Sequence, residues 1–128
     1  KKGDTKYTDN RGTVELRAAA ADYLTKFDLH YDKQDEILIT MGASEGIDLA
    51  LRTLVNPGEE ALVAEPSYVS YIPCIELCGG VPVSLKLRAE NKFRLTREQL
   101  EEKITEKSKV LLISYPNNPT GPLWKRKI

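Results

Sequence analysis

Apolar side chains recur at helical spacing in two segments of the chain. Residues 13–26 are rich in helix-forming residues, and their apolar side chains make one stripe that continues just past the segment: Leu16, Ala20, Tyr23 and Phe27. Residues 47–55 show the same spacing of three and four. Both segments are therefore predicted to form helices with one apolar face.

Two further helices are predicted from the residues that begin or end them. Residues 67–78 are expected to be helical, with Pro73 in the first turns or at a kink, and the two glycines that follow stop this helix. Thr96 is expected to begin the other helix, because Gln99 stands three residues later, as a capping box requires.

Short apolar runs between these helices predict strands. The runs near 37–41, 61–64 and 110–114 are nearly all apolar, as expected for strands that are covered on both faces. Residues 81–87 alternate instead, which predicts a strand with one side better buried. Strands that alternate with helices imply right-handed crossovers, so we expect an α/β fold with a partial, mostly parallel sheet and helices on both faces.

The composition fits one globular domain. The 128 residues are 41% hydrophobic and 30% charged, and 19 basic and 19 acidic side chains give a net charge of zero. Neither a nucleic acid nor an anionic membrane is therefore an expected partner. The apolar runs are too short to span a bilayer and the N-terminal residues lack the apolar region of a secretory signal, so we expect a cytoplasmic protein.

The cysteines do not predict a metal site. Cys74 and Cys78 could share one face of a helix, but the single histidine, His30, lies far away in the sequence. We expect both cysteines to be small packing residues, and no metal ligand is predicted.

Three unusual loops follow the ends of predicted strands. They read "MGASEG", "EPSY" and "YPNNPTG". Ligands of open α/β sheets bind beyond the carboxyl ends of the strands, where such loops meet. The sequence therefore favours a cofactor site at this edge.

The "GASEG" loop combines small residues with the start of a helix. Free backbone N–H groups and the positive end of the helix dipole would make an anion site, most plausibly for a phosphate. The same residues could form a plain turn capped by Ser44. The spacing fits neither a Walker loop nor a dinucleotide fingerprint, although Glu65 stands where a ribose-binding acid would and keeps a degenerate Rossmann site as an alternative.

The other two loops carry a tyrosine and an asparagine of interest. Tyr68 could offer its face to a planar ring, or it could be a core residue, a role that Tyr71 would fill instead. Asn118 stands before Pro119, and this peptide bond can be cis. An amide held so rigidly could donate to a phenolate oxygen and favour its ionised form.

Together these residues resemble the class I and II aminotransferases, which are pyridoxal-phosphate enzymes of fold type I. Four stretches match in order: "YTDNRGTVELRAAAADYL", "ITMGASEGIDLAL", "EPSYVSY" with its later glycine pair, and "SYPNNPTG". The Asn-Pro-Thr-Gly signature is the most specific of them. The resemblance implies the first half of the large domain, and within the family it is nearest to the branch that acts on aromatic amino acids or acyl-diaminopimelate.

The resemblance also implies contacts to pyridoxal 5'-phosphate. The asparagine that binds the phenolic oxygen in this family falls on Asn118, and the aromatic residue that stacks on the pyridine ring falls on Tyr68.

For the phosphate, the family's backbone contacts fall on Ala43, Ser44 and Glu45. The tyrosine that reaches the phosphate of the neighbouring subunit falls on Tyr7, which implies a homodimer.

Other parts of the family's site find no match in this chain. The Schiff-base lysine, the aspartate of the pyridinium nitrogen and the arginine of the substrate carboxylate all lie further along the family's sequence. We therefore expect a fragment without catalytic residues of its own, inactive alone, that associates with itself or with the missing half. Residues 1–30 would be the opening segment and helix, 31–121 the first half of the cofactor-binding domain, and 122–128 a non-matching tail.

The implied reaction moves an amino group between an amino acid and a 2-oxo acid. A carbon–sulfur lyase of the same fold type is an alternative, because the residues that decide the reaction are not in this chain. A second alternative is the aminotransferase-like sensor domain of a transcription regulator, which would need a basic helix-turn-helix upstream.

Overall fold

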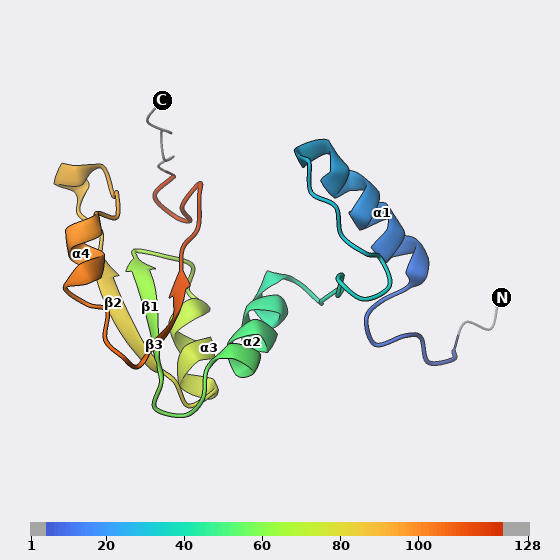
Figure 1. The fold of residues 1–128 in the computed structure, drawn as a ribbon, viewed down its shortest axis with the longest axis horizontal. Coiled ribbons are helices and arrows are strands. Elements are labelled where there is room, and N and C mark those ends of the chain that lie inside the picture. Colours follow the sequence, from blue (N-terminus) through green and yellow to red (C-terminus); the bar gives the residue numbers. More distant parts are fainter. Residues whose placement is uncertain (1–4, 122–128) are drawn as a thin grey trace. The chain divides into compact units, whose positions relative to one another are not determined.

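The computed structural model describes residues 5–121 (Figure 1). The chain divides into two compact units, and the division falls between Glu45 and Gly46, inside helix α2 (Ala43–Leu54). Each unit is described by itself.

The first unit contains the predicted N-terminal helix. Helix α1 (Val14–Leu24) begins after Thr13, whose hydroxyl oxygen accepts the N–H of Leu16 at 3.3 Å. A single turn of 3-10 helix, η1 (Thr25–Phe27), extends it and ends at Asp28, which has a left-handed backbone with φ of 59°. This helix confirms the prediction, although more than half of the surface of Leu16, Tyr23 and Phe27 is exposed.

The strand predicted near 37–41 does not form among the described residues. Residues 37–40 belong to no helix or strand, and the sheet contains only other segments. The N–H of Ile39 donates to the carbonyl oxygen of Arg11 at 3.0 Å, which is a contact to a turn rather than to a strand. The prediction was wrong here because an apolar run becomes a strand only beside a partner strand that pairs its backbone groups.

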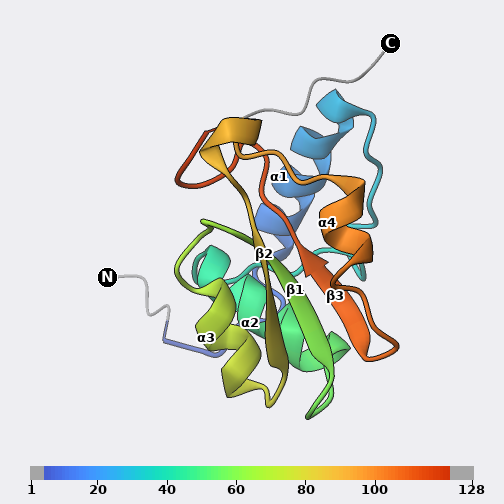
Figure 2. The same ribbon diagram turned by 90° about the vertical axis from the view of Figure 1, so that its left-hand side faces the viewer.

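The second unit is built around a parallel sheet. Its strands are β1 (Glu60–Glu65), β2 (Val81–Lys86) and β3 (Ser108–Leu112), in the spatial order β2-β1-β3. The crossover through α3 (Tyr71–Leu77) runs from β1 to β2, and the chain then returns past β1, through η2 (Ala89–Asn91) and α4 (Arg97–Glu101), to β3. Two right-handed crossovers in opposite directions place their helices on opposite faces of the sheet, as Figures 1 and 2 show. The predicted fold class is confirmed.

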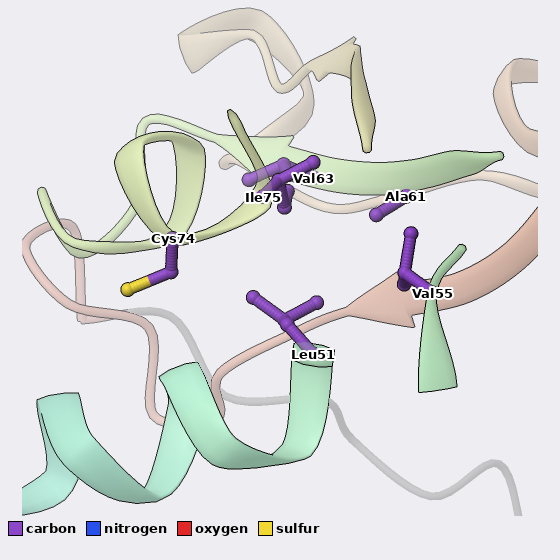
Figure 3. Packing of buried hydrophobic residues seen from close by; sticks show 6 residues of the cluster. All are labelled: Leu51, Val55, Ala61, Val63, Cys74 and Ile75. Carbon is purple, nitrogen blue, oxygen red and sulfur yellow. The ribbon is translucent and has the colours of Figure 1, made fainter. Parts of the chain in front are cut away.

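The main core lies between this sheet and helices α2 and α3. Its buried members are Leu51, Val55, Ala61, Val63, Cys74 and Ile75 (Figure 3). Because side chains alternate along a strand, Leu62 faces the other side, where it lines a cavity of about 170 Å³ with residues of α4 and β3. Strand β1 is thus buried on both faces, as predicted.

Strand β3 is less well covered than predicted. Val110 and Leu112 pack against the main core, but Leu111 and the following Ile113 are 38% and 41% exposed. Among residues 5–121, strand β3 has one neighbour in the sheet, β1. Helix α4, which is five residues long, lies on part of its second face. The prediction of full burial therefore holds for the central strand and fails at this edge.

Most of the predicted helix boundaries are confirmed. The threonine of the capping box, Thr96, accepts the N–H of Gln99 at 3.3 Å and donates its own N–H to that side chain at 3.1 Å. Helix α3 starts later than residue 67, at Tyr71, and contains Pro73 in its first turn. It ends at Leu77, and Gly79, two residues later, has a left-handed backbone with φ of +82°.

Candidate functional site

The loops after β1 and β3 meet at the carboxyl edge of the sheet. The two strands are parallel neighbours, so their carboxyl ends lie side by side. The side-chain nitrogen of Asn117, in the loop after β3, donates to the carbonyl oxygen of Pro66, in the loop after β1, at 2.9 Å. It also donates to the hydroxyl oxygen of Thr120 at 2.6 Å. Two of the three loops noted in the sequence are therefore joined at one edge.

These joined loops carry Tyr68 and Asn118. Tyr68 is half-buried, and its ring meets that of Tyr71 edge to face, with centroids 5.9 Å apart and planes at 78°. Tyr71 packs against the main core, so the core role falls to that residue. Asn118 is exposed, and its peptide bond to Pro119 is cis. An aromatic ring and a side-chain amide thus belong to neighbouring loops of one edge.

The third loop leads into helix α2. Gly42 has a φ of +88°, and the helix begins at the next residue, Ala43. The carboxylate of Glu45 accepts the N–H of Met41, so this side chain caps the helix start. The first N–H groups of an α-helix lack partners within the helix, and the helix dipole makes this end attractive to anions.

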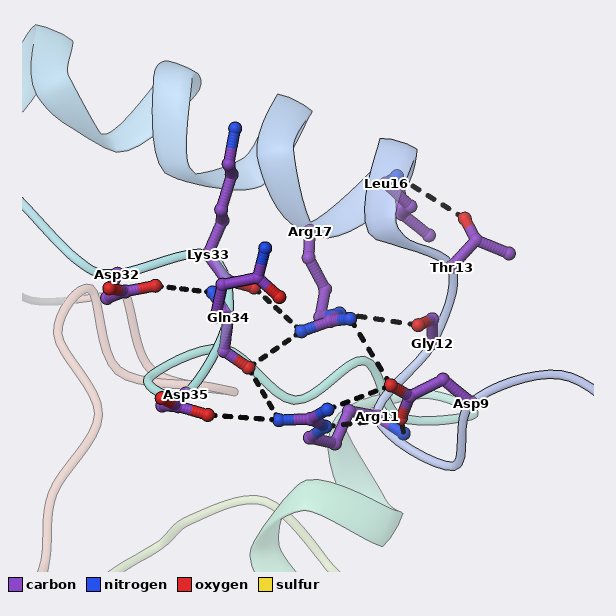
Figure 4. A network of polar contacts seen from close by, with 10 residues as sticks. All are labelled: Asp9, Arg11, Gly12, Thr13, Leu16, Arg17, Asp32, Lys33, Gln34 and Asp35. Atoms are coloured by element: carbon purple, nitrogen blue, oxygen red, sulfur yellow. Dashed lines mark hydrogen bonds and ion pairs between the residues drawn. The ribbon is translucent and has the colours of Figure 1, made fainter.

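Tyr7 precedes a polar network in the first unit (Figure 4). Its side chain is fully exposed. Two residues later, the carboxylate of Asp9 accepts bonds from the guanidinium of Arg11 at 2.9 and 3.1 Å and from that of Arg17 at 3.4 Å. The hydrogen bonds from Arg11 are the main reason why the pKa of Asp9 falls to about 2.

Arg17 is the centre of this network, and its role was not predicted from the sequence. Its side chain is 1% exposed although it lies on a helix. Besides Asp9, it donates to the carbonyl oxygens of Gly12 at 3.3 Å, Lys33 at 2.7 Å and Gln34 at 2.8 Å. Arg17 is followed on the helix by the alanines of 18–21. Their short side chains were the one indication in the sequence that another segment could pack close to the helix at this point.

Asn117 was also missed as a structural residue. A role was predicted only for the second asparagine of the pair, Asn118. The structure buries the first, Asn117, which is 6% exposed. Nothing in the local sequence distinguishes the two, because the partner at Pro66 is 51 residues away.

The described residues offer no metal site. Among residues 5–121, no group of three or more His, Cys, Asp or Glu side chains could hold a metal ion. Cys74 is buried in the main core, where burial raises the pKa of its thiol, and Cys78 packs against the same core. Both are free thiols, in agreement with the packing role predicted for them. Within the same range, no helix has both the length and the apolar content of a membrane-spanning segment.

Comparison with known proteins identifies the family. A family profile described as "Aminotransferase class I and II" matches residues 1–127. The chain belongs to the class I and II aminotransferase family.

Individual aminotransferases agree with this assignment. The chain is 43% identical over 118 residues to a protein of Bacillus subtilis (strain 168) named "Probable N-acetyl-LL-diaminopimelate aminotransferase", covering 91% of the chain and 30% of that protein. It is 40% identical over 127 residues to aromatic-amino-acid aminotransferase 2 of Thermococcus litoralis, covering 98% and 33%. Neither a lyase nor a transcription regulator is favoured by these matches.

A solved structure of this family has the same fold. The crystal structure of an aromatic aminotransferase from Pyrococcus horikoshii OT3 superposes with a TM-score of 0.91 at 37% identity, covering 96% of the chain and 33% of that protein. The chain thus spans about a third of the length of the aminotransferases that it matches.

Proposed function

We propose that this chain supplies part of the pyridoxal 5'-phosphate site of an aminotransferase that moves an amino group between an amino acid and a 2-oxo acid. The observation that carries the proposal is the joined edge of the sheet. There the hydrogen bond from Asn117 to Pro66 connects the loop of Tyr68 with the loop of Asn118. A flat phosphorylated ring needs an aromatic face and a donor for its oxygen, and these two loops offer both.

The ring contacts would come from Tyr68 and Asn118. Tyr68 is half-buried, so its ring is partly fixed by the protein, and an aromatic face suits stacking on a pyridine ring. The amide of Asn118 can donate to the phenolic oxygen, which favours the ionised form of that oxygen. When bound, the cofactor itself supplies the electron sink that amino-group transfer needs.

The phosphate contacts would come from the start of α2. Ala43, Ser44 and Glu45 lie in the first turn, where backbone N–H groups favour an anion. Glu45 would contribute through its backbone N–H alone, because its carboxylate caps the helix and repels a phosphate. The fully exposed Tyr7 would reach the phosphate of a neighbouring subunit in a homodimer.

Catalysis needs residues that this chain does not match. No lysine of the chain stands in the family's Schiff-base motif, so covalent catalysis is not open to it alone. We therefore expect the complete protein, a cytoplasmic homodimer, to transaminate and the 128-residue chain to be inactive. Amino-acid turnover by the isolated chain would contradict this.

Binding can be tested without catalysis. The analogue 4'-deoxypyridoxine 5'-phosphate has no aldehyde and cannot react with surface lysines, so nuclear magnetic resonance titration of the isolated chain reports the site itself. We expect saturable shifts at Ala43–Glu45, Tyr68 and Asn118. The replacement Asn118→Ala should weaken binding, whereas Asn91→Ala, a control at an exposed asparagine bonded to the carbonyl of Arg94, should not. Shifts scattered over the surface, or equal binding by both variants, would refute the proposal.

A further inference from the structure

Asn117 is buried, and its side-chain nitrogen makes two hydrogen bonds. A side-chain amide group has two N–H donors, and those of Asn117 go to the carbonyl oxygen of Pro66 at 2.9 Å and to the hydroxyl of Thr120 at 2.6 Å. The backbone carbonyl of Asn117 accepts the N–H of Gly121 at 2.7 Å. The bonds to Thr120 and Gly121 close a turn within one loop. The bond to Pro66 differs from these, because it joins the loop after β3 to the loop after β1.

The two partners of this bond lie close in sequence to the two residues that are proposed to contact the cofactor ring. Pro66 stands two residues before Tyr68, and Asn117 stands directly before Asn118. Parallel strands set the spacing of their own backbones, but the chain is free to diverge once a strand has ended. Each loop also has hydrogen bonds of its own, such as Tyr71 N–H to the carbonyl oxygen of Tyr68 and the Ser114 hydroxyl to the carbonyl oxygen of Pro116.

We propose that Asn117 is a positioning residue, which sets the spacing between Tyr68 and Asn118 before any ligand binds. The proposal rests on the function proposed above, in which these two residues contact one ring. A site whose contacts are already in place avoids the entropic cost of ordering two loops when the ligand arrives. Asn117 itself need not touch the ligand.

The unliganded chain provides the first test. Nuclear magnetic resonance should show slow exchange of the Asn117 side-chain protons and nuclear Overhauser contacts between them and Pro66 or Ser67. Fast exchange without such contacts in the wild-type chain would overturn the proposal directly, whether or not any variant folds.

Variants separate the bond between loops from the closed turn. In Asn117→Ala we expect loss of the nuclear Overhauser contacts between backbone protons of the two loops and faster amide exchange in residues 67–70, while the core signals of β1 remain. Thr120→Val removes only the partner within the turn, and Thr120→Ser keeps its hydroxyl, so both should retain the contacts between the loops. The matched control Asn118→Ala should retain them as well. Contacts that persist in Asn117→Ala would overturn the proposal.

Binding of 4'-deoxypyridoxine 5'-phosphate tests whether the hydrogen bond between Asn117 and Pro66 affects the cofactor site. At a temperature where all variants are folded, Asn117→Ala should bind the analogue roughly ten-fold more weakly, as for one lost buried hydrogen bond. The absorption spectrum of the bound analogue should also move toward the neutral phenol, since Asn118 is no longer held in place. Unchanged affinity and spectrum in Asn117→Ala would overturn the positioning role. If the wild-type chain has the hydrogen bond between Asn117 and Pro66 but does not bind the analogue, the proposed cofactor site is refuted instead.

Discussion

Replacing Arg17 by alanine would remove the guanidinium that ties helix α1 to two other segments of its unit. The side chain crosses from the helix to the turn at Gly12 and to the loop at Lys33 and Gln34. These segments lie 5, 16 and 17 residues from Arg17 in the sequence. We expect the helix to open much more often in the variant, because its polar anchor is lost.

The magnitude follows from the partners that are left behind. Removing one member of a buried charged network costs about 3–5 kcal/mol when the other groups stay buried. Here the carbonyl of Gln34 keeps a bond of 2.7 Å from Arg11, and the side chain of Asp9 is 35% exposed and can be solvated. We therefore expect about 2–4 kcal/mol, which corresponds to opening about 30- to 1,000-fold more often.

Hydrogen exchange of the amides in Val14–Leu24 measures this opening directly. Arg17→Lys keeps the positive charge but loses the planar guanidinium with its several N–H donors, so the exchange rate in this variant should fall between those of the wild type and Arg17→Ala. The control Lys26→Ala removes an exposed cation that lies 5.1 Å from the centre of the Tyr23 ring, and exchange should rise less than about five-fold. A comparable small rise in Arg17→Ala would refute the reasoning.

Further predictions concern one backbone position, one carboxyl group and one cap. Gly12→Ala would place a Cβ 2.7 Å from that of Ile39 at a φ of +93°, so urea unfolding should show that the free energy of unfolding falls by about 2 kcal/mol or more. In the control Gly58→Ala, where no atom lies near the added Cβ, it should fall by about 1 kcal/mol, and equal losses in the two variants would contradict the prediction. Because bonds from Arg11 lower the pKa of Asp9 from 3.8 to about 2, its contribution to stability is complete above about pH 4 and is lost as the pH falls toward 2. Exchange of the α1 amides should therefore rise over that interval, and Asp9→Asn should abolish the change. Thr96→Ala should destabilise α4 by about 1 kcal/mol and Thr96→Ser much less, as chemical shifts of residues 97–101 would report; an unaltered helix in Thr96→Ala would count against the capping box.

Local elements were predictable because their causes are local. The capping box of Thr96 joins residues three apart, and the left-handed glycine after α3 ends its helix through bonds to the preceding turn. Strand β1 was recognisable since a central strand is apolar on both faces, and its burial follows that pattern. The positions of Tyr68 and Asn118 after the strands β1 and β3 also followed from the order of elements.

The apolar run at 37–41 was predicted to be a strand, but the local sequence does not determine whether it pairs. It is as apolar as β1, but pairing decides whether such a run becomes a strand, and no described strand lies beside it. The partial exposure of β3 has the same origin, since its coverage depends on elements far away in the sequence.

The sequence by itself determined the α/β order of elements, most of the helix boundaries and the family to which the chain belongs. Tertiary structure alone decided that Arg17 would be buried and that Asn117, rather than its neighbour, would join the two loops. The physical reason is distance along the chain. A buried polar side chain is stable only with its hydrogen-bond partners, and those of Arg17 and Asn117 include residues up to 17 and 51 positions away, which folding alone brings within reach.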